Sequence, residues 1–127
     1  MSKPTVAGSI RNARAIAEFA NNFSSVAVIP CGERWHDGTL RPAFEDFLGA
    51  GAIISSLNGI KSPEALAAQA IFESVESQIQ NEIMRCASGI ELIEQGFIDD
   101  VIIASSLNVS STIPQIMNGE FRKLQVE

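Results

Sequence analysis

The chain has 127 residues, of which 46% are hydrophobic and 19% are charged, and its formal net charge at pH 7 is −6. This length and apolar content predict a single domain over residues 1–127. The acidic balance argues against nucleic-acid binding, which needs a basic surface, and no apolar run approaches the ~18 residues that cross a membrane. We expect a cytoplasmic protein, because the start shows no export signal and two cysteines make no disulfide framework.

The first predicted unit is a strand, a helix and a second strand. Residues 5–10 are predicted to form a short strand, and residues 12–23 place apolar side chains at helical spacing. Residues 25–30 contain a continuous apolar run, typical of a strand that is buried on both faces. Such a unit predicts a parallel pair with a right-handed crossover. Residues 8–12 and 32–34 would then emerge at one sheet edge, where open α/β sheets bind ligands.

Helices are predicted to follow. Pro42 suits the first turn of a helix, and Gly49 and Gly51 within that helix indicate either close approach of a neighbouring element or an early helix end. Residues 62–64, Ser-Pro-Glu, are a helix start. Apolar residues at every fourth position then predict one surface helix that runs to about Cys86.

The last third contains shorter elements. Residues 88–91 match a capping box that opens a short helix ending at Gly96. Residues 101–107 are predicted as a short helix or a strand, and residues 118–119, Asn-Gly, indicate a hairpin. Together the elements predict an α/β fold: a small, mainly parallel sheet with flanking helices in three layers.

Residues with functional side chains gather in the stretch 29–46. It holds the only Trp, the only His and four carboxylates, between two apolar runs, and loops on a rigid scaffold often carry function. A carboxylate from Glu33 and one from residues 45–46 are the oxygen ligands that Mg²⁺ favours. The alternatives are a surface pair between Glu33 and Arg34 and a solvated helix face.

A second candidate stretch is residues 8–12, where the first strand passes into the helix. Free backbone N–H groups at a helix start and the adjacent Arg11 favour a small anion. The alternative is that Ser9 or Asn12 only caps the helix. Four of the six arginines lie in the first third of this acidic chain, which suits a small anionic ligand better than a polymer.

Short motifs follow one another in a fixed order along nearly the whole chain. They are Gly8-Ser9-Ile10-Arg11-Asn12-Ala13, Pro30-Cys31-Gly32-Glu33-Arg34-Trp35, Asp37-Gly38, Leu40-Arg41-Pro42-Ala43, Glu45-Asp46, residues 48–54, Cys86-Ala87-Ser88-Gly89, Glu91-Leu92, Gly96-Phe97, Asp100-Val101, Ala104, Pro114, Gly119 and Phe121. In this order they resemble the C-terminal half of the 2-phosphosulfolactate phosphatase family.

The resemblance implies a Mg²⁺-dependent phosphatase for a small phosphorylated acid such as 2-phosphosulfolactate. Glu33 and Asp46 would be the catalytic carboxylates and would hold the metal. The substrate-binding residues would be Ser9, Arg11, Asn12, Arg34 and Arg41.

The family's chains are about twice this length, and the sequence departs from them there. Their N-terminal half carries an Asp-Val-Leu-Arg-Ala-Thr-Thr segment and a Thr-Thr-Asn-Gly-Thr loop, and neither occurs here. Open sheet edges invite pairing, so we expect a homo-oligomer or a partner chain that supplies the other half. The alternative is a non-catalytic relative that binds a small anion or acts as an assembly module.

Overall fold

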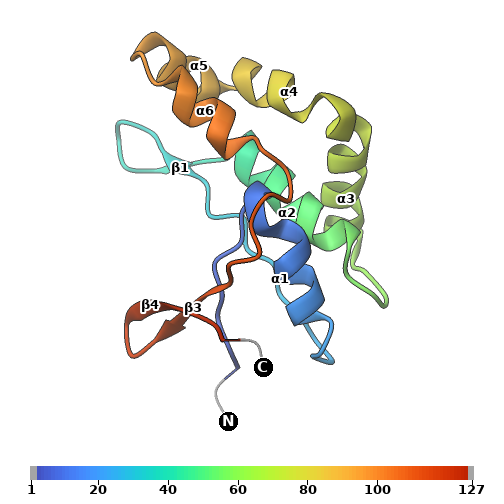
Figure 1. The fold of residues 1–127 in the computed structure, drawn as a ribbon. Helices are drawn as coiled ribbons and strands as arrows, with labels where there is room; N and C mark the ends of the chain where they lie inside the picture. Colours follow the sequence, from blue (N-terminus) through green and yellow to red (C-terminus); the bar gives the residue numbers. More distant parts are fainter. Residues whose placement is uncertain (1–2, 126–127) are drawn as a thin grey trace.

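The computed structural model describes residues 3–125 as a mixed α/β chain in which helices dominate (Figure 1). The helices are η1 (Ile10–Asn12, a 3-10 turn), α1 (Ala13–Ala20), α2 (Phe44–Ser55), α3 (Pro63–Val75), η2 (Glu76–Gln78, a 3-10 turn), α4 (Ile79–Arg85), α5 (Ala87–Glu94) and α6 (Ile98–Ala104). The strands are β1 (Glu33–Arg34), β2 (Leu40–Arg41), β3 (Pro114–Met117) and β4 (Glu120–Lys123).

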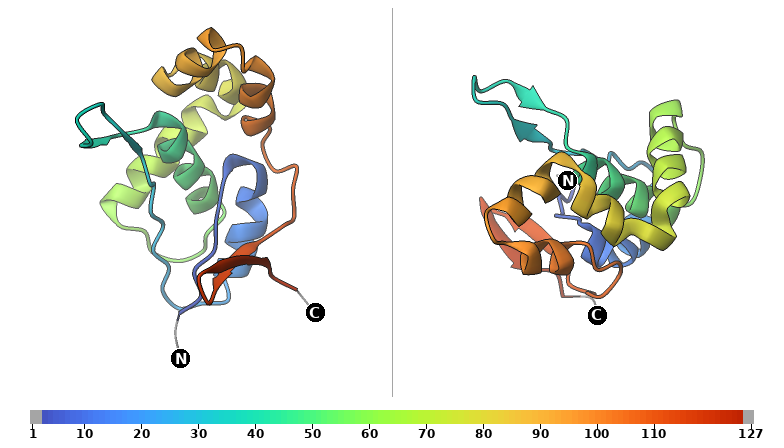
Figure 2. Two further views of the ribbon diagram at one scale, coloured as in Figure 1. Left: turned by 90° about the vertical axis from the view of Figure 1, so that its left-hand side faces the viewer. Right: turned by 90° about the horizontal axis from the view of Figure 1, so that it is seen from above.

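The core is built around α2. Residues 48–54 of this helix are all buried, and Leu48 is fully buried in a cluster with Ile16 of α1 and Phe72 of α3. Helices α4, α5 and α6 lie together at one end of the molecule, and the β3–β4 hairpin lies at the other (Figures 1 and 2). The middle of α2 is therefore fixed by packing, whereas its first turn faces the β1–β2 hairpin.

Close packing of α2 on α3 depends on Gly51. A Cβ atom at this position would overlap the backbone carbonyl of Ala68 and would lie 2.8 Å from the Cβ of Phe72. Gly49 is different, because a Cβ there would meet nothing nearer than Ile10, at 3.9 Å. The predicted close approach of a neighbouring element is confirmed at Gly51 and not at Gly49.

The mainly parallel, three-layer sheet of the sequence prediction is not confirmed. The two sheets within residues 3–125 are antiparallel and two-stranded, one made of β1 and β2 and one of β3 and β4. Residues 5–7 lie antiparallel beside β3, where the N–H of Ala7 donates to the carbonyl of Pro114 at 2.8 Å. Residues 25–30 form no strand. The apolar run marks a strand-like segment, but pairing also needs a neighbour, which periodicity does not supply.

Two helix boundaries also differ from the prediction. The single helix expected over residues 62–86 breaks after Val75, whose φ of −120° and ψ of 1° leave the α region, and η2 and α4 follow. The capping box expected at Ser88 is wrong, because α5 begins at Ala87 with Cys86 as its N-cap. The start at Ser62 is confirmed, since its hydroxyl accepts a hydrogen bond from the N–H of Ala65 at 3.2 Å.

Several turn predictions are confirmed. Asn118 and Gly119, both with positive φ, form the turn between β3 and β4. Gly96 follows α5 with a φ of 87°, which is the left-handed conformation that glycine adopts without strain. Of the two alternatives for residues 101–107, the helix is correct in its first part, as α6. None of the helices within residues 3–125 combines the length and apolarity needed to cross a lipid bilayer.

The Gly51 contact yields a matched test. We expect Gly51→Ala to lower the free energy of unfolding by about 1–3 kcal/mol, because the methyl group overpacks the α2–α3 contact. Gly49→Ala, in the same helix, should be neutral or stabilising by up to about 1 kcal/mol, since alanine favours helix and space is available. Urea unfolding followed by circular dichroism measures both. Equal stabilities of the two variants would contradict the packing of α2 on α3.

Candidate functional site

Asp46 lies in the first turn of α2, against the loop that precedes β1. Its Oδ2 accepts a hydrogen bond from the backbone N–H of Gly32 at 2.7 Å. Gly32 has a φ of 74°, and a Cβ there would lie 2.9 Å from Leu40. The loop therefore needs glycine at this position, and Asp46 holds it in place.

Burial raises the pKa of Asp46 above its usual value. The hydrogen bond from Gly32 opposes this shift, and the neighbouring charge of Glu45 adds to it. Partial burial destabilises the charged form of a carboxyl group, and a nearby cation stabilises that form.

The β1–β2 hairpin carries three more of the predicted residues, and two of them, Glu33 and Arg34, lie on β1. Both are exposed and border a hollow of about 420 Å³ that Cys31, Gly32, Glu33, Arg34 and Leu40 line. Arg34 donates from Nη1 to the carbonyl of Gly38 at 2.8 Å, which closes the hairpin. Gly32 links the parts of this site, because it adjoins Glu33 in the chain and binds Asp46 in space.

Arg41, on β2, is buried, with only 8% of its surface exposed. Its Nη2 lies 3.3 Å from the hydroxyl of Ser88 and 3.4 Å from Oε2 of Glu91. Its guanidinium carbon lies 5.7 Å from the ring centroid of Trp35, within the range of a cation–π interaction. Arg41 thus joins the hairpin to the start of α5.

Cys86, just before α5, and Ser88 and Glu91, within α5, are residues that the sequence reasoning did not single out as site residues. Cys86 Sγ lies 3.7 Å from Oε2 of Glu45 and 3.0 Å from the carbonyl of Ile83, and burial raises the pKa of this thiol. Ser88 and Glu91 reach Arg41, as described above. The motif at residues 86–91 was the only signal for this group, and no local spacing rule indicated that it meets α2.

The structure uses the residues predicted at the end of the first strand mainly to hold the chain together. Asn12 is buried; its amide donates to the carbonyl of Thr112 at 2.9 Å and accepts from the N–H of Ser9 at 2.7 Å. Arg11 donates from Nη1 to the carbonyl of Ile103 at 2.6 Å. Within the described part of the chain, no hydrogen bond or ion pair joins this stretch to residues 32–46. The structure therefore does not bring the two predicted stretches together through polar contacts.

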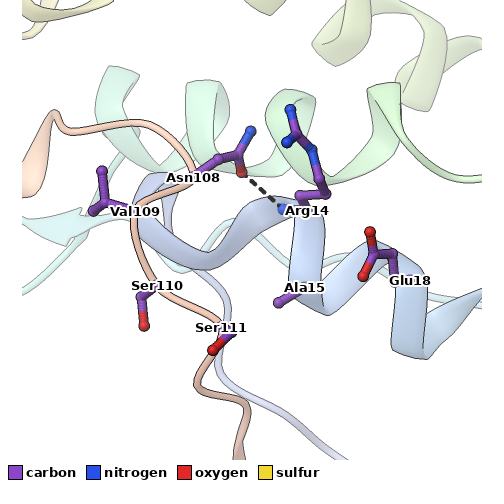
Figure 3. A pocket seen from close by; sticks show the side chains of 7 residues that line it. All are labelled: Arg14, Ala15, Glu18, Asn108, Val109, Ser110 and Ser111. Atoms are coloured by element: carbon purple, nitrogen blue, oxygen red, sulfur yellow. Dashed lines mark hydrogen bonds between the residues drawn. The ribbon is translucent and has the colours of Figure 1, made fainter.

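Another hollow, of about 320 Å³, lies between α1 and the segment 108–111 (Figure 3). Asn108, with a φ of 54°, accepts from the backbone N–H of Arg14 at 2.9 Å and so fixes this segment to α1. Its lining residues are Arg14, Ala15, Glu18, Asn108, Val109, Ser110 and Ser111. None of the predicted site residues is among them, so the candidate site is the group around the start of α2.

Asp46, in the first turn of α2, and Glu33, on β1, have the carboxylate oxygens that Mg²⁺ binds in proteins. Two carboxylates would supply only part of the coordination shell of this ion. Within residues 3–125, no group of three or more His, Cys, Asp or Glu side chains is arranged to hold a metal ion. Mg²⁺ commonly takes only one or two carboxylates and completes its shell with water and phosphate oxygens. The two predicted ligands from this chain are Asp46, which accepts the hydrogen bond from the N–H of Gly32, and Glu33, which follows Gly32 in the chain.

The fold and the site define the class of protein. It is an α/β protein in which Glu45 and Asp46 begin α2, and Arg34 and Arg41 lie on the β1–β2 hairpin before that helix. The family model described as 2-phosphosulpholactate phosphatase matches residues 1–119. The chain belongs to this family, and the resemblance read from the order of its motifs is confirmed.

Individual relatives agree. A probable 2-phosphosulfolactate phosphatase of Carboxydothermus hydrogenoformans is 36% identical over 118 residues, which cover 90% of this chain and 47% of the relative. The 2-phosphosulfolactate phosphatase of Methanothermobacter thermautotrophicus is 30% identical, over 93% of this chain and 50% of the relative. A probable 2-phosphosulfolactate phosphatase of Thermotoga maritima is 29% identical, over 94% and 51%. The chain thus spans about half the length of the curated relatives that it matches.

The buried guanidinium of Arg41 gives a prediction on stability. Arg41→Ala should lower the free energy of unfolding by about 1–3 kcal/mol, because it removes packing and charge-assisted hydrogen bonds at a buried position. Trp35 fluorescence should change at the same time, since the cation beside its ring is lost. Arg85→Ala, at a side chain that is 75% exposed, is the matched control and should stay within about 0.5 kcal/mol of the parent.

The raised pKa of Asp46 gives a prediction on pH. Stability that depends on this group is fully present below the unfolded-state pKa and is lost as pH rises through the higher folded-state pKa. Asp46→Asn should therefore gain stability relative to the parent as pH increases from about 4 to about 7. Urea unfolding at the two pH values measures this gain.

Asp37→Asn is the control with the opposite sign. Hydrogen bonds from the side chain and the backbone of Thr39 lower the pKa of Asp37, so its contribution is present at high pH and lost as pH falls. This variant should lose stability relative to the parent as pH rises from about 2 to about 4, and it should change little between about 4 and about 7, because the unfolded-state pKa of Asp lies near 4. A parallel response of the two variants would contradict the environment described for Asp46.

Proposed function

We propose that this chain carries part of the active site of a Mg²⁺-dependent phosphatase that acts on a small phosphorylated acid such as 2-phosphosulfolactate. The observation that supports it most is the pairing of Asp46 with Gly32, which holds a partly buried carboxylate beside Glu33 and the hollow of the β1–β2 hairpin. Family membership supports the reaction class.

In this proposal Glu33 and Asp46 hold the metal. When bound, Mg²⁺ supplies positive charge to the phosphoryl oxygens and to the attacking water. Arg34 binds the phosphate or the acid group of the substrate. Arg34 borders the hollow, and only one of its N–H groups donates to the carbonyl of Gly38, so the others can donate to an anion. Arg41 lies opposite Glu33 in the β1–β2 pair and is the second candidate for binding the substrate anion.

Ser9, Arg11 and Asn12 are also assigned to substrate binding in this proposal, although their hydrogen bonds lead to other parts of the chain. Asn12 is buried with its amide engaged, so a substrate would need to displace hydrogen bonds that hold the chain together. Arg11 keeps free N–H groups beyond the one that binds Ile103, and it remains the candidate anion ligand of the three.

The rest of the site would come from outside these residues, either from another copy of the chain or from a partner that supplies the other half of the relatives' length. The second candidate function is a binding module that keeps the anion hollow without turnover. It is favoured by the coverage, since the chain spans only about half the length of the relatives that it matches. Activity with and without a chain for the other half separates the two.

Phosphate release from 2-phosphosulfolactate tests the proposal. We expect turnover that EDTA abolishes and Mg²⁺ restores, and a loss of at least about 100-fold in Glu33→Gln and in Asp46→Asn, because each removes a metal ligand. Glu120→Gln, on the exposed strand β4, is the matched control and should keep full activity.

The binding module makes a different prediction in the same preparations. Sulfate would raise the melting temperature of the parent, Arg34→Ala would remove the shift, and no phosphate would be released even with the other half present. That set of results would overturn the phosphatase.

A further inference from the structure

Residues 24–31, between α1 and β1, form an elongated stretch without pairing (Figure 2, left). Within the described part of the chain, none of their backbone N–H or C=O groups takes part in a backbone–backbone hydrogen bond. All of these residues are exposed except Val28, which is half-buried. A stretch of unpaired backbone groups is the template that an added β-strand uses.

The side chains of this stretch suit a strand inside a sheet. Residues 26–29, Val-Ala-Val-Ile, are all apolar, and in a strand alternate residues point to opposite faces. Val28 packs against both clusters of the core. Ile29, on the opposite face, is 77% exposed. Strands with apolar side chains on both faces are typical of sheets covered by helices on each side.

Strand β4 forms a free edge of the β3–β4 sheet, and this edge is protected. Strand β4 is exposed along its whole length and carries Glu120, Arg122 and Lys123. Charged side chains at an edge prevent another chain from pairing with it. Residues 24–31 contain no charged side chain, so this edge lacks that protection.

We propose that residues 25–30 are an interior strand of a sheet whose neighbouring strand lies in the half of the family's chain outside these 127 residues, and that a helix of that half covers Ile29. The length supports this occupant, since the matched relatives have about as many residues again beyond the match. A second copy of this chain is the weaker occupant, because two paired strands without further cover are marginal in water. The proposal concerns assembly and does not depend on catalysis.

The test joins this chain to the unmatched part of the Carboxydothermus hydrogenoformans relative, in the order in which the relative carries the two parts. Amide hydrogen exchange of residues 25–29 is compared between this full-length chimaera and the 127-residue chain, since Pro30 has no N–H. We expect exchange slowed by about 100-fold or more in the chimaera, because the amides gain strand partners. The chain alone should exchange these amides rapidly.

Two variants locate the contact. Ile29→Lys should lower the melting temperature of the chimaera by several degrees and leave that of the chain alone unchanged, because its side chain is covered only in the chimaera. Ile60→Lys, at another exposed isoleucine in a loop, is the matched control and should change neither.

Each other result would overturn the proposal. A folded chimaera with rapid exchange at residues 25–29, or one that tolerates Ile29→Lys, would show that the segment has no partner in the other half. A chimaera that does not fold would show that the two halves do not complement each other. Slow exchange in the chain alone, together with a dimer by light scattering, would identify a second copy as the occupant.

Discussion

The burial of α2 is the constraint on which the candidate site depends. Residues 48–54 are enclosed by α1 on one side and by α3 on the other, and contact with α3 is possible only because position 51 has no side chain. The helix can therefore neither rotate nor slide without losing its packing. This fixes the direction in which its first turn points, and with it the carboxylates of Glu45 and Asp46. One meets the turn before α5 and the other the loop before β1.

The polar residues around this helix divide into those that hold the fold and those that keep free hydrogen-bonding groups. A buried polar group must find partners or cost stability, and Asn12 and Arg41 are buried and engaged. Glu33 and Arg34 are exposed at the hairpin. Asp46 stands between the two sets, with one oxygen bound to backbone and a pKa raised by burial. Binding of a cation at Asp46 would therefore change the stability of the fold.

Most turn and capping signals in the sequence predicted the observed structure, although the capping box at Ser88 did not, and long-range pairing was not predicted. The hairpin at Asn118 and Gly119 follows from turn chemistry, and the helix start at Ser62 follows from capping. Strand pairing depends on which segments lie side by side, so the apolar run at residues 25–30 could be recognised as strand-like but not assigned a neighbour. The same limit applies to Arg41, whose partner Glu91 lies 50 residues away. A βαβ pattern implied a parallel pair, and the described residues hold no second strand for it.

Completion of the sheet and completion of the site are physically linked in this chain. The unpaired stretch leads directly into Gly32, whose N–H binds Asp46 and whose neighbour Glu33 borders the hollow. Backbone hydrogen bonds formed along residues 25–30 would restrict the loop that follows, since a loop has less freedom when the strand before it is fixed. A partner strand would then order Glu33 relative to Asp46 even without contributing a ligand itself. In the proposal that Glu33 and Asp46 hold Mg²⁺, the half that closes the sheet edge would therefore also restrict the distance between the two carboxylates.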